Sequence, residues 1–183
     1  AYEKNLIKKH EYTKPEKEDD RVNNIIKLNA QTGPVLLAYK NNNEISKLLN
    51  NVKNENPTYN VISHDNSNHK IWIVEDNRRI REILDEINSM DSLFIADGHH
   101  RSAAALRVKK ELSKKNPNHI GDENYNYFLA VAFPHSEMNI LDYNRIIKGL
   151  NGHTTDTLLS NIEKKFSVKK HEIEFRPKNI NTF

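Results

Sequence analysis

The residues with the clearest capacity for chemistry form one short run, Asp97-Gly98-His99-His100-Arg101. Apolar residues 92–96 precede this run and predict a buried strand, and an alanine-rich helix is predicted to follow over about 100–115. A glycine at such a junction lets the backbone approach a ligand closely, and the first turn of a helix offers free N–H groups. With Arg101 and a histidine as further donors, the run predicts a site for phosphate oxygens.

Asp97 does not fit a simple anion site, because a bare carboxylate repels phosphate. Three roles stay open: Asp97 binds a Mg²⁺ ion beside the phosphates, accepts a proton from a substrate hydroxyl, or caps the helix. The first two roles indicate phosphoryl transfer, and the third is structural. A transition-metal site on His99 and His100 is disfavoured, because adjacent helical residues point about 100° apart.

Residues 96–104 resemble the signature of the family of domains of unknown function 1015. The Asp-Gly-His-His-Arg run is also similar to the motif of free serine kinases in the ParB/sulfiredoxin-like superfamily. Further blocks of the first family occur in the expected order, namely Lys9-His10-Glu11, Asp20-Arg21, residues 32–37 and residues 144–150. The resemblance covers residues 5–165 and implies a ParB/sulfiredoxin-like core.

The resemblance implies a role for each matching residue. In the serine kinases, a Pro-His-Glu segment supplies the glutamate that is assigned as base on the serine hydroxyl, and His10-Glu11 is the matching pair here, after Lys9. The implied catalytic residues are Glu11 and Asp97, and the implied nucleotide-binding residues are Gly98, His99, His100 and Arg101. His10 and Arg21 are implied to support the site. The implied cofactors are ATP or ADP and Mg²⁺, which is held through Asp97.

The predicted function is that of a Mg²⁺-dependent small-molecule kinase, which transfers phosphate from ATP or ADP to a hydroxyl substrate such as free serine. Two alternatives stay open. One is a non-catalytic nucleotide-binding module of the ParB-like type, and the other is an interaction domain in which the run at 97–101 only begins a helix.

The remaining polar residues each have a plainer interpretation. Glu11 alone is a surface carboxylate, Asp20-Arg21 are charges in the first turn of a helix, and Thr32-Gly33-Pro34 ends that helix. Arg145 and Lys148 form a basic surface turn. The functional alternatives are that Asp20-Arg21 brace the site, that the turn at Gly33 lines the nucleotide pocket, and that the two later basic residues reach phosphate.

The pattern of apolar residues predicts the elements that must position this site. Strands are predicted over 35–39, 59–62, 71–74, 92–96, 127–133, 139–141 and 167–175. Helices are predicted over 18–30, 44–52, 77–87, 100–115 and 155–166. The irregular alternation favours a mixed α+β (α/β) fold, with a mixed sheet flanked by helices, over a doubly wound parallel sheet.

Composition narrows the classes of protein further. The 183 residues predict a single domain, with a nucleotide-binding-like core over 5–150 and an extension over 151–183, cut from a longer chain. The absence of cysteine excludes disulfides, thiolate zinc sites and a cysteine nucleophile, and it favours a cytoplasmic protein. No apolar run predicts a membrane span. The 28 basic and 25 acidic residues are interspersed, which disfavours nucleic acid as a partner.

Overall fold

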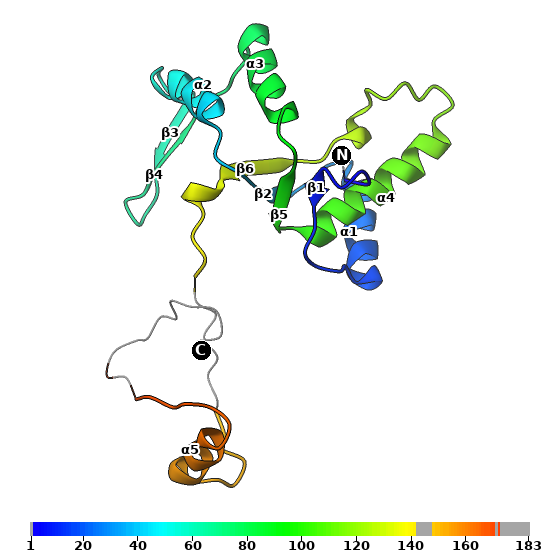
Figure 1. Cartoon of the computed structure of the whole chain (residues 1–183). Coiled ribbons are helices and arrows are strands. Elements are labelled where there is room, and N and C mark those ends of the chain that lie inside the picture. The colour runs from blue at the N-terminus through cyan, green and yellow to red at the C-terminus, as the bar shows by residue number, and fades with distance from the viewer. Residues whose placement is uncertain (1, 142–147, 171, 173–183) are drawn as a thin grey trace. The chain divides into compact units, whose positions relative to one another are not determined.

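The structure is a computed structural model that describes residues 2–141, 148–170 and 172. The chain divides into two compact units, residues 1–138 and 139–183. In the first unit, four strands form one mixed sheet in the order β1-β5-β2-β6 (Figure 1). Strands β1 and β5 are parallel, β5 and β2 are antiparallel, and β2 and β6 are parallel. The fold class predicted from the sequence is therefore confirmed.

From α1 to α5 the described helices follow the predicted order, and β1 is a short strand in addition to those predicted. The strands of the sheet are β1 (Ile7–Lys8), β2 (Val35–Tyr39), β5 (Leu93–Asp97) and β6 (Ala130–Pro134). A separate hairpin contains β3 (Tyr59–Ile62) and β4 (Asn68–Ile71). The helices are α1 (Pro15–Leu28), α2 (Asn43–Lys53), α3 (Asn77–Asn88), α4 (His99–Lys115) and, in the second unit, α5 (Thr155–Glu163). None of the helices in the described ranges is long and apolar enough to cross a membrane.

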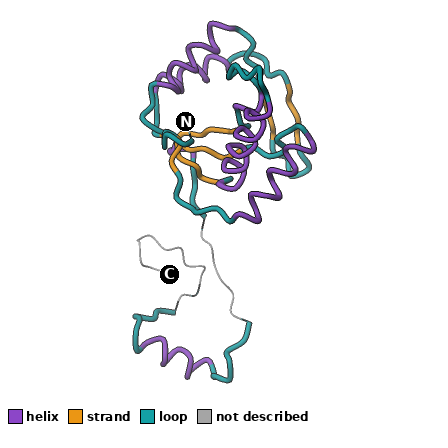
Figure 2. The backbone as a smooth tube through the Cα atoms, turned by 90° about the vertical axis from the view of Figure 1, so that its right-hand side faces the viewer, coloured by secondary structure: helices purple, strands orange, loops and turns teal. Residues whose placement is uncertain are grey.

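Two apolar clusters hold the sheet and the helices together. The first lies on the sheet, where Ile7, Val35, Leu37 and Ile95 are buried. The second joins α1 to α4, which lie side by side in Figure 1, through Val22, Ala104 and Val108. Small side chains at residues 102–105 are buried on α4, so α4 packs closely against its neighbours. Figure 2 shows the strands side by side with helices around them.

Several element boundaries differ from the sequence prediction. Helix α1 begins at Pro15, earlier than predicted, because a proline in the first helical turn needs no N–H partner. Strand β4 covers 68–71 instead of 71–74, because the Trp72 indole donates to the Glu55 carbonyl and the Ile73 N–H donates to Thr58 Oγ1. The start of β6 at Ala130 is later than the predicted residue 127.

Two predicted strands near the end of the chain are not found among the described residues. Residues 139–141 form no strand, so the strand predicted there is wrong. Residues 167–170 form none either, and most of the remaining predicted strand, over 171–175, lies outside the described residues. Helix α5 ends at Glu163, before the predicted end at 166. Thr154 caps the start of α5, where its side chain accepts a hydrogen bond from the Thr157 N–H at 3.2 Å.

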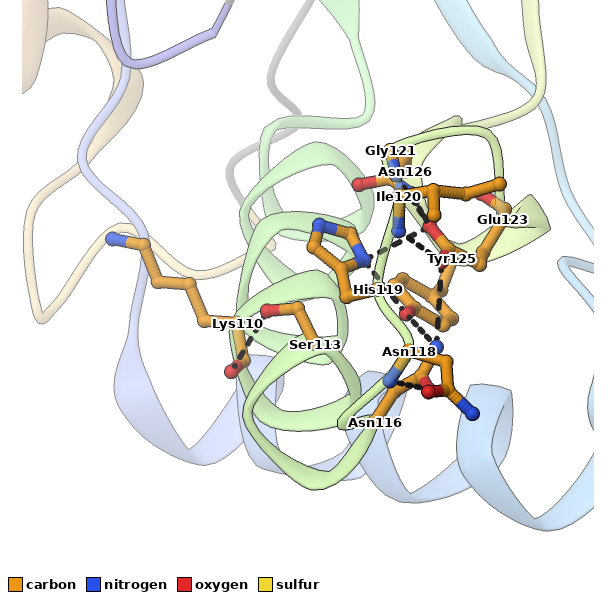
Figure 3. A network of polar contacts seen from close by, with 10 residues as sticks. All are labelled: Lys110, Ser113, Asn116, Asn118, His119, Ile120, Gly121, Glu123, Tyr125 and Asn126. Atoms are coloured by element: carbon orange, nitrogen blue, oxygen red, sulfur yellow. Dashed lines mark hydrogen bonds and ion pairs between the residues drawn. The ribbon is translucent and has the colours of Figure 1, made fainter.

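The connection after α4 is held by the carboxylate of Glu123 (Figure 3). Glu123 accepts hydrogen bonds from the N–H groups of Ile120 at 2.8 Å and Gly121 at 3.0 Å. It also contacts His119 Nδ1 at 2.9 Å and the amide of Asn126 at 2.9 Å. Burial raises the pKa of Glu123, but the backbone donors and His119 outweigh it and lower this pKa to about 2.

We predict that Glu123 makes the stability of the first unit sensitive to acid. Because the folded pKa is about 2 and the ordinary value is 4.5, the stabilisation is present above pH 4.5 and is lost as the pH falls toward 2. The free energy of unfolding of Glu123→Gln should therefore lie below that of the wild type at pH 6 and approach it at pH 3. Urea denaturation measures both. Glu16→Gln, an exposed acid on α1, is the control, and a gap that stays constant with pH would contradict the prediction.

Candidate functional site

The predicted anion site lies where β5 passes into α4. Gly98 is the residue before the helix, and its φ of +100° lies in the left-handed region that favours glycine. The first helical hydrogen bond of α4 runs from the Ser102 N–H to the Gly98 carbonyl at 2.9 Å. The backbone N–H groups of residues 99–101 therefore have no partner within the helix, as expected for a helix start.

A β-bulge places Asp97 at the end of β5. Asp97 lies opposite Leu36, whereas Ile95 lies opposite Leu37, so Ala96 is an extra residue in the β5–β2 ladder. The Asp97 side chain is 73% exposed. No side chain caps α4, and Asp97 accepts no hydrogen bond from a described backbone N–H. The alternative in which Asp97 caps the helix is therefore wrong.

Arg101 joins three segments of the chain. Its Nη2 lies 2.5 Å from Asp97 Oδ2, and its Nη1 donates to the carbonyl of Pro34 in the α1–β2 connection. The guanidinium also lies against two glycines, because a Cβ would stand 3.1 Å from Nε at Gly98 and 3.3 Å from Nη1 at Gly33. The turn at residues 32–34, predicted either to end a helix or to line the pocket, thus touches a predicted site residue.

His99 brings the His10-Glu11 pair to the start of α4. Its side chain is 3% exposed, and its Nδ1 lies 3.5 Å from Glu11 Oε2. The N–H of His10 donates to His99 Nε2 at 3.4 Å, across 89 residues of sequence, and the two rings pack edge to face with centroids 4.4 Å apart. Since Nε2 accepts, the neutral ring carries its proton on Nδ1, which donates toward Glu11.

Burial is the main cause that lowers the pKa of His99, and the neighbouring His10 lowers it further. Glu11 and Asp97 act in the opposite direction but do not compensate. His99 is therefore held as a neutral ring, which favours a role in orienting Glu11 over direct charge pairing with phosphate.

His100 anchors the same segment at a second point. Its Nε2 accepts a hydrogen bond from the Lys14 N–H at 3.1 Å. The two histidines thus hold residues 10–14 against the first turn of α4, with Tyr12 between them 99% exposed. Sequence reasoning missed this anchoring. The only sequence signal for it is the adjacency of two histidines at a helix start, which equally suits phosphate binding.

The other predicted residues have the following positions. Arg21 lies on α1, forms an ion pair with Asp20 at 2.7 Å, and lines a cavity that Arg101 also lines. The predicted site residues thus lie around the start of α4. Arg145 lies outside the described residues, and Lys148 is exposed in the second unit. Among the described residues, no three His, Asp or Glu side chains gather in a way that could hold a metal ion by themselves.

Comparison with known proteins assigns the chain to a family. The family described as "Protein of unknown function (DUF1015)" matches residues 1–183, the whole chain. The protein belongs to this family, as its Asp-Gly-His-His-Arg run predicts. No curated protein and no solved structure matches the chain.

We predict that glycine is required at position 98 for two separable reasons. Gly98→Ala introduces both an unfavourable φ and a Cβ that meets Arg101, whereas Gly121→Ala has a φ of +105° with nothing within 4 Å. Each positive φ should cost about 1–2 kcal/mol, and Gly98→Ala should cost more than Gly121→Ala because Arg101 must move. Gly33→Ala tests the contact with Arg101 without a positive φ. Urea denaturation of the three variants measures these losses, and equal losses at 98 and 121 would refute the contact with Arg101.

We also predict that His99 lowers stability in mild acid. Its folded pKa is below the ordinary value of 6.5, so its contribution is present above pH 6.5 and is lost as the pH falls below that value. The stability difference between wild type and His99→Gln should therefore be largest near pH 8 and narrow toward pH 5. His64→Gln, on an exposed turn, controls for the loss of any one histidine. A difference that widens in acid would show that His99 is held as a cation instead.

Proposed function

We propose that this protein is a Mg²⁺-dependent phosphotransferase that moves a phosphoryl group from ATP or ADP to a small hydroxyl substrate such as free serine. The observation that supports the proposal most is the contact between Glu11 and His99, at 3.5 Å, beside a helix start with free N–H groups. The carboxylates of Glu11 and Asp97 thus lie near a helix start whose free N–H groups suit phosphate, which supports phosphoryl transfer.

Each part of the proposed site has a distinct task. The N–H groups of residues 99–101, His100 and Arg101 hold the nucleotide phosphates at the turn formed by Gly98. Asp97 is exposed, and only its Oδ2 is bonded to Arg101, so its second oxygen is free for a Mg²⁺ ion. One carboxylate fits this ion, because Mg²⁺ in nucleotide sites takes much of its coordination from phosphates and water. When bound, the ion neutralises charge on the phosphates.

Glu11 is the proposed general base. The acceptor oxygen attacks the terminal phosphorus of the nucleotide, and the hydroxyl proton passes to the Glu11 carboxylate. The bond from that phosphorus to the bridging oxygen breaks, and its electron pair stays on the leaving nucleotide, which is shorter by one phosphate. His99 acts through Glu11 as a positioning residue, since its Nδ1 proton points toward Oε2.

A non-catalytic nucleotide-binding module of the ParB-like type is the second candidate. It is favoured by the ion pair between Asp97 and Arg101, in which each group neutralises the other. A site that needs only to hold a nucleotide can keep this pair closed, whereas catalysis as proposed above also uses Asp97 for the ion.

We predict that turnover depends on both carboxylates. Protein incubated with serine, Mg²⁺ and ATP or ADP should form phosphoserine, detected by ³¹P NMR. Glu11→Gln should slow product formation by about 100-fold or more, since a positioned base contributes at least this much. Asp97→Asn should also slow it strongly, because it removes the charged ligand proposed for Mg²⁺. Glu16→Gln, an acid on the exposed first turn of α1, should leave the rate unchanged.

The outcomes separate the two candidates. Nucleotide binding by calorimetry without any product would favour the binding module. Product formation that survives in both Glu11→Gln and Asp97→Asn would refute the assigned mechanism, even if the wild type is a kinase.

A further inference from the structure

A cavity lies beside the proposed site, on the α1 side of Arg101. Its volume is about 230 Å³, and its lining includes residues of α1, of the α1–β2 connection and of α4. The lining residues that matter for its chemistry are Asp20, Arg21, Asn24, Ile25, Thr32 and Arg101. Arg101 is thus shared between this cavity and the start of α4.

Helix geometry separates this cavity from Glu11. His99 and Arg101 are two residues apart on α4, so their side chains leave the helix about 200° apart. His99 contacts Glu11, and Arg101 lines the cavity. The proposed base and the cavity therefore lie on opposite sides of the helix start that would hold the phosphates.

Phosphoryl transfer requires this kind of separation. The attacking and leaving oxygens lie roughly in line on opposite sides of the transferred phosphorus. If the acceptor hydroxyl is on the side of Glu11, the leaving nucleotide extends toward the opposite side. The geometry points to the cavity beside Arg101 as the nucleoside subsite of the proposed kinase, an inference that rests on the proposed function.

The charges around the cavity suit an uncharged group. Asp20 and Arg21 neutralise each other at 2.7 Å. Arg101 is the remaining cation of the lining, and the proposed function assigns it to the nucleotide phosphates at the start of α4. No unbalanced cation is therefore left among the described lining residues to select a second anion. This favours the sugar and base of a nucleotide over a further phosphate or carboxylate.

The uncharged lining residues match a nucleoside. The amide of Asn24 and the hydroxyl of Thr32 make no hydrogen bond with another described residue, so their donors and acceptors are free. An Asn amide can pair with the edge of a base, and Ile25 offers an apolar contact to its face. The Asp20 carboxylate can accept from ribose hydroxyls while it stays paired with Arg21.

A matched pair of tryptophan variants tests this inference. Asn24→Trp places an indole at the cavity, whereas Asn23→Trp places one on the neighbouring exposed position of α1, which does not line it. Calorimetry on the full chain measures the affinity for MgATP and for Mg²⁺-tripolyphosphate, which has the phosphates but no nucleoside. We expect Asn24→Trp to weaken MgATP binding by about tenfold or more, with tripolyphosphate binding unchanged. Asn23→Trp should alter neither affinity.

The possible failures are distinguishable. If Asn24→Trp binds MgATP as tightly as the wild type, or loses equal affinity for both ligands, the cavity is not the nucleoside subsite and the proposed kinase function stands. The same holds if the wild type binds MgATP no more tightly than tripolyphosphate. If the wild type binds neither ligand, both the subsite and the proposed function are refuted.

Discussion

The arrangement of the candidate site depends on the guanidinium of Arg101. It pairs with Asp97 at the end of β5 and donates to the Pro34 carbonyl in the α1–β2 connection, so one planar group fixes two segments that are far apart in sequence. The position of the Arg101 guanidinium requires glycine at residues 33 and 98, because a Cβ at either residue would lie within 3.4 Å of it. A lysine could not replace it, because an ammonium lacks the fixed pair of donors that reaches both acceptors.

The second constraint on the site is the buried ring of His99. Burial holds it neutral, and a neutral imidazole can accept from the His10 N–H on one nitrogen and donate toward Glu11 on the other. His100 repeats the arrangement with the Lys14 N–H. Side-chain contacts, instead of strand pairing, therefore attach the residues before α1 to α4. The contacts that bring Glu11 to the helix start also bury the His99 ring.

The comparison between prediction and structure is most instructive at particular elements. The apolar runs at 35–39 and 92–96 predict β2 and β5 well, because buried strands need continuous apolar residues. The pattern places β4 three residues too late, because Trp72 and Ile73 are apolar but their N–H donors bond outside the β3–β4 ladder, to Glu55 and Thr58. Which acceptors bind these N–H groups depends on residues outside the strand, so the local pattern of apolar residues does not predict where β4 ends.

Sequence alone determined the family, the strand–glycine–helix junction and the chemical types of its residues. These follow from local rules, since Gly98 and the free N–H groups of a helix start are properties of a few consecutive residues. Only the tertiary structure decided which side of α4 faces Glu11, that Asp97 pairs with Arg101 instead of capping the helix, and that Arg21 and Arg101 share a cavity. Those features depend on packing between residues far apart in the sequence, such as Glu11 and His99, and the folded chain, rather than residue spacing, sets such distances.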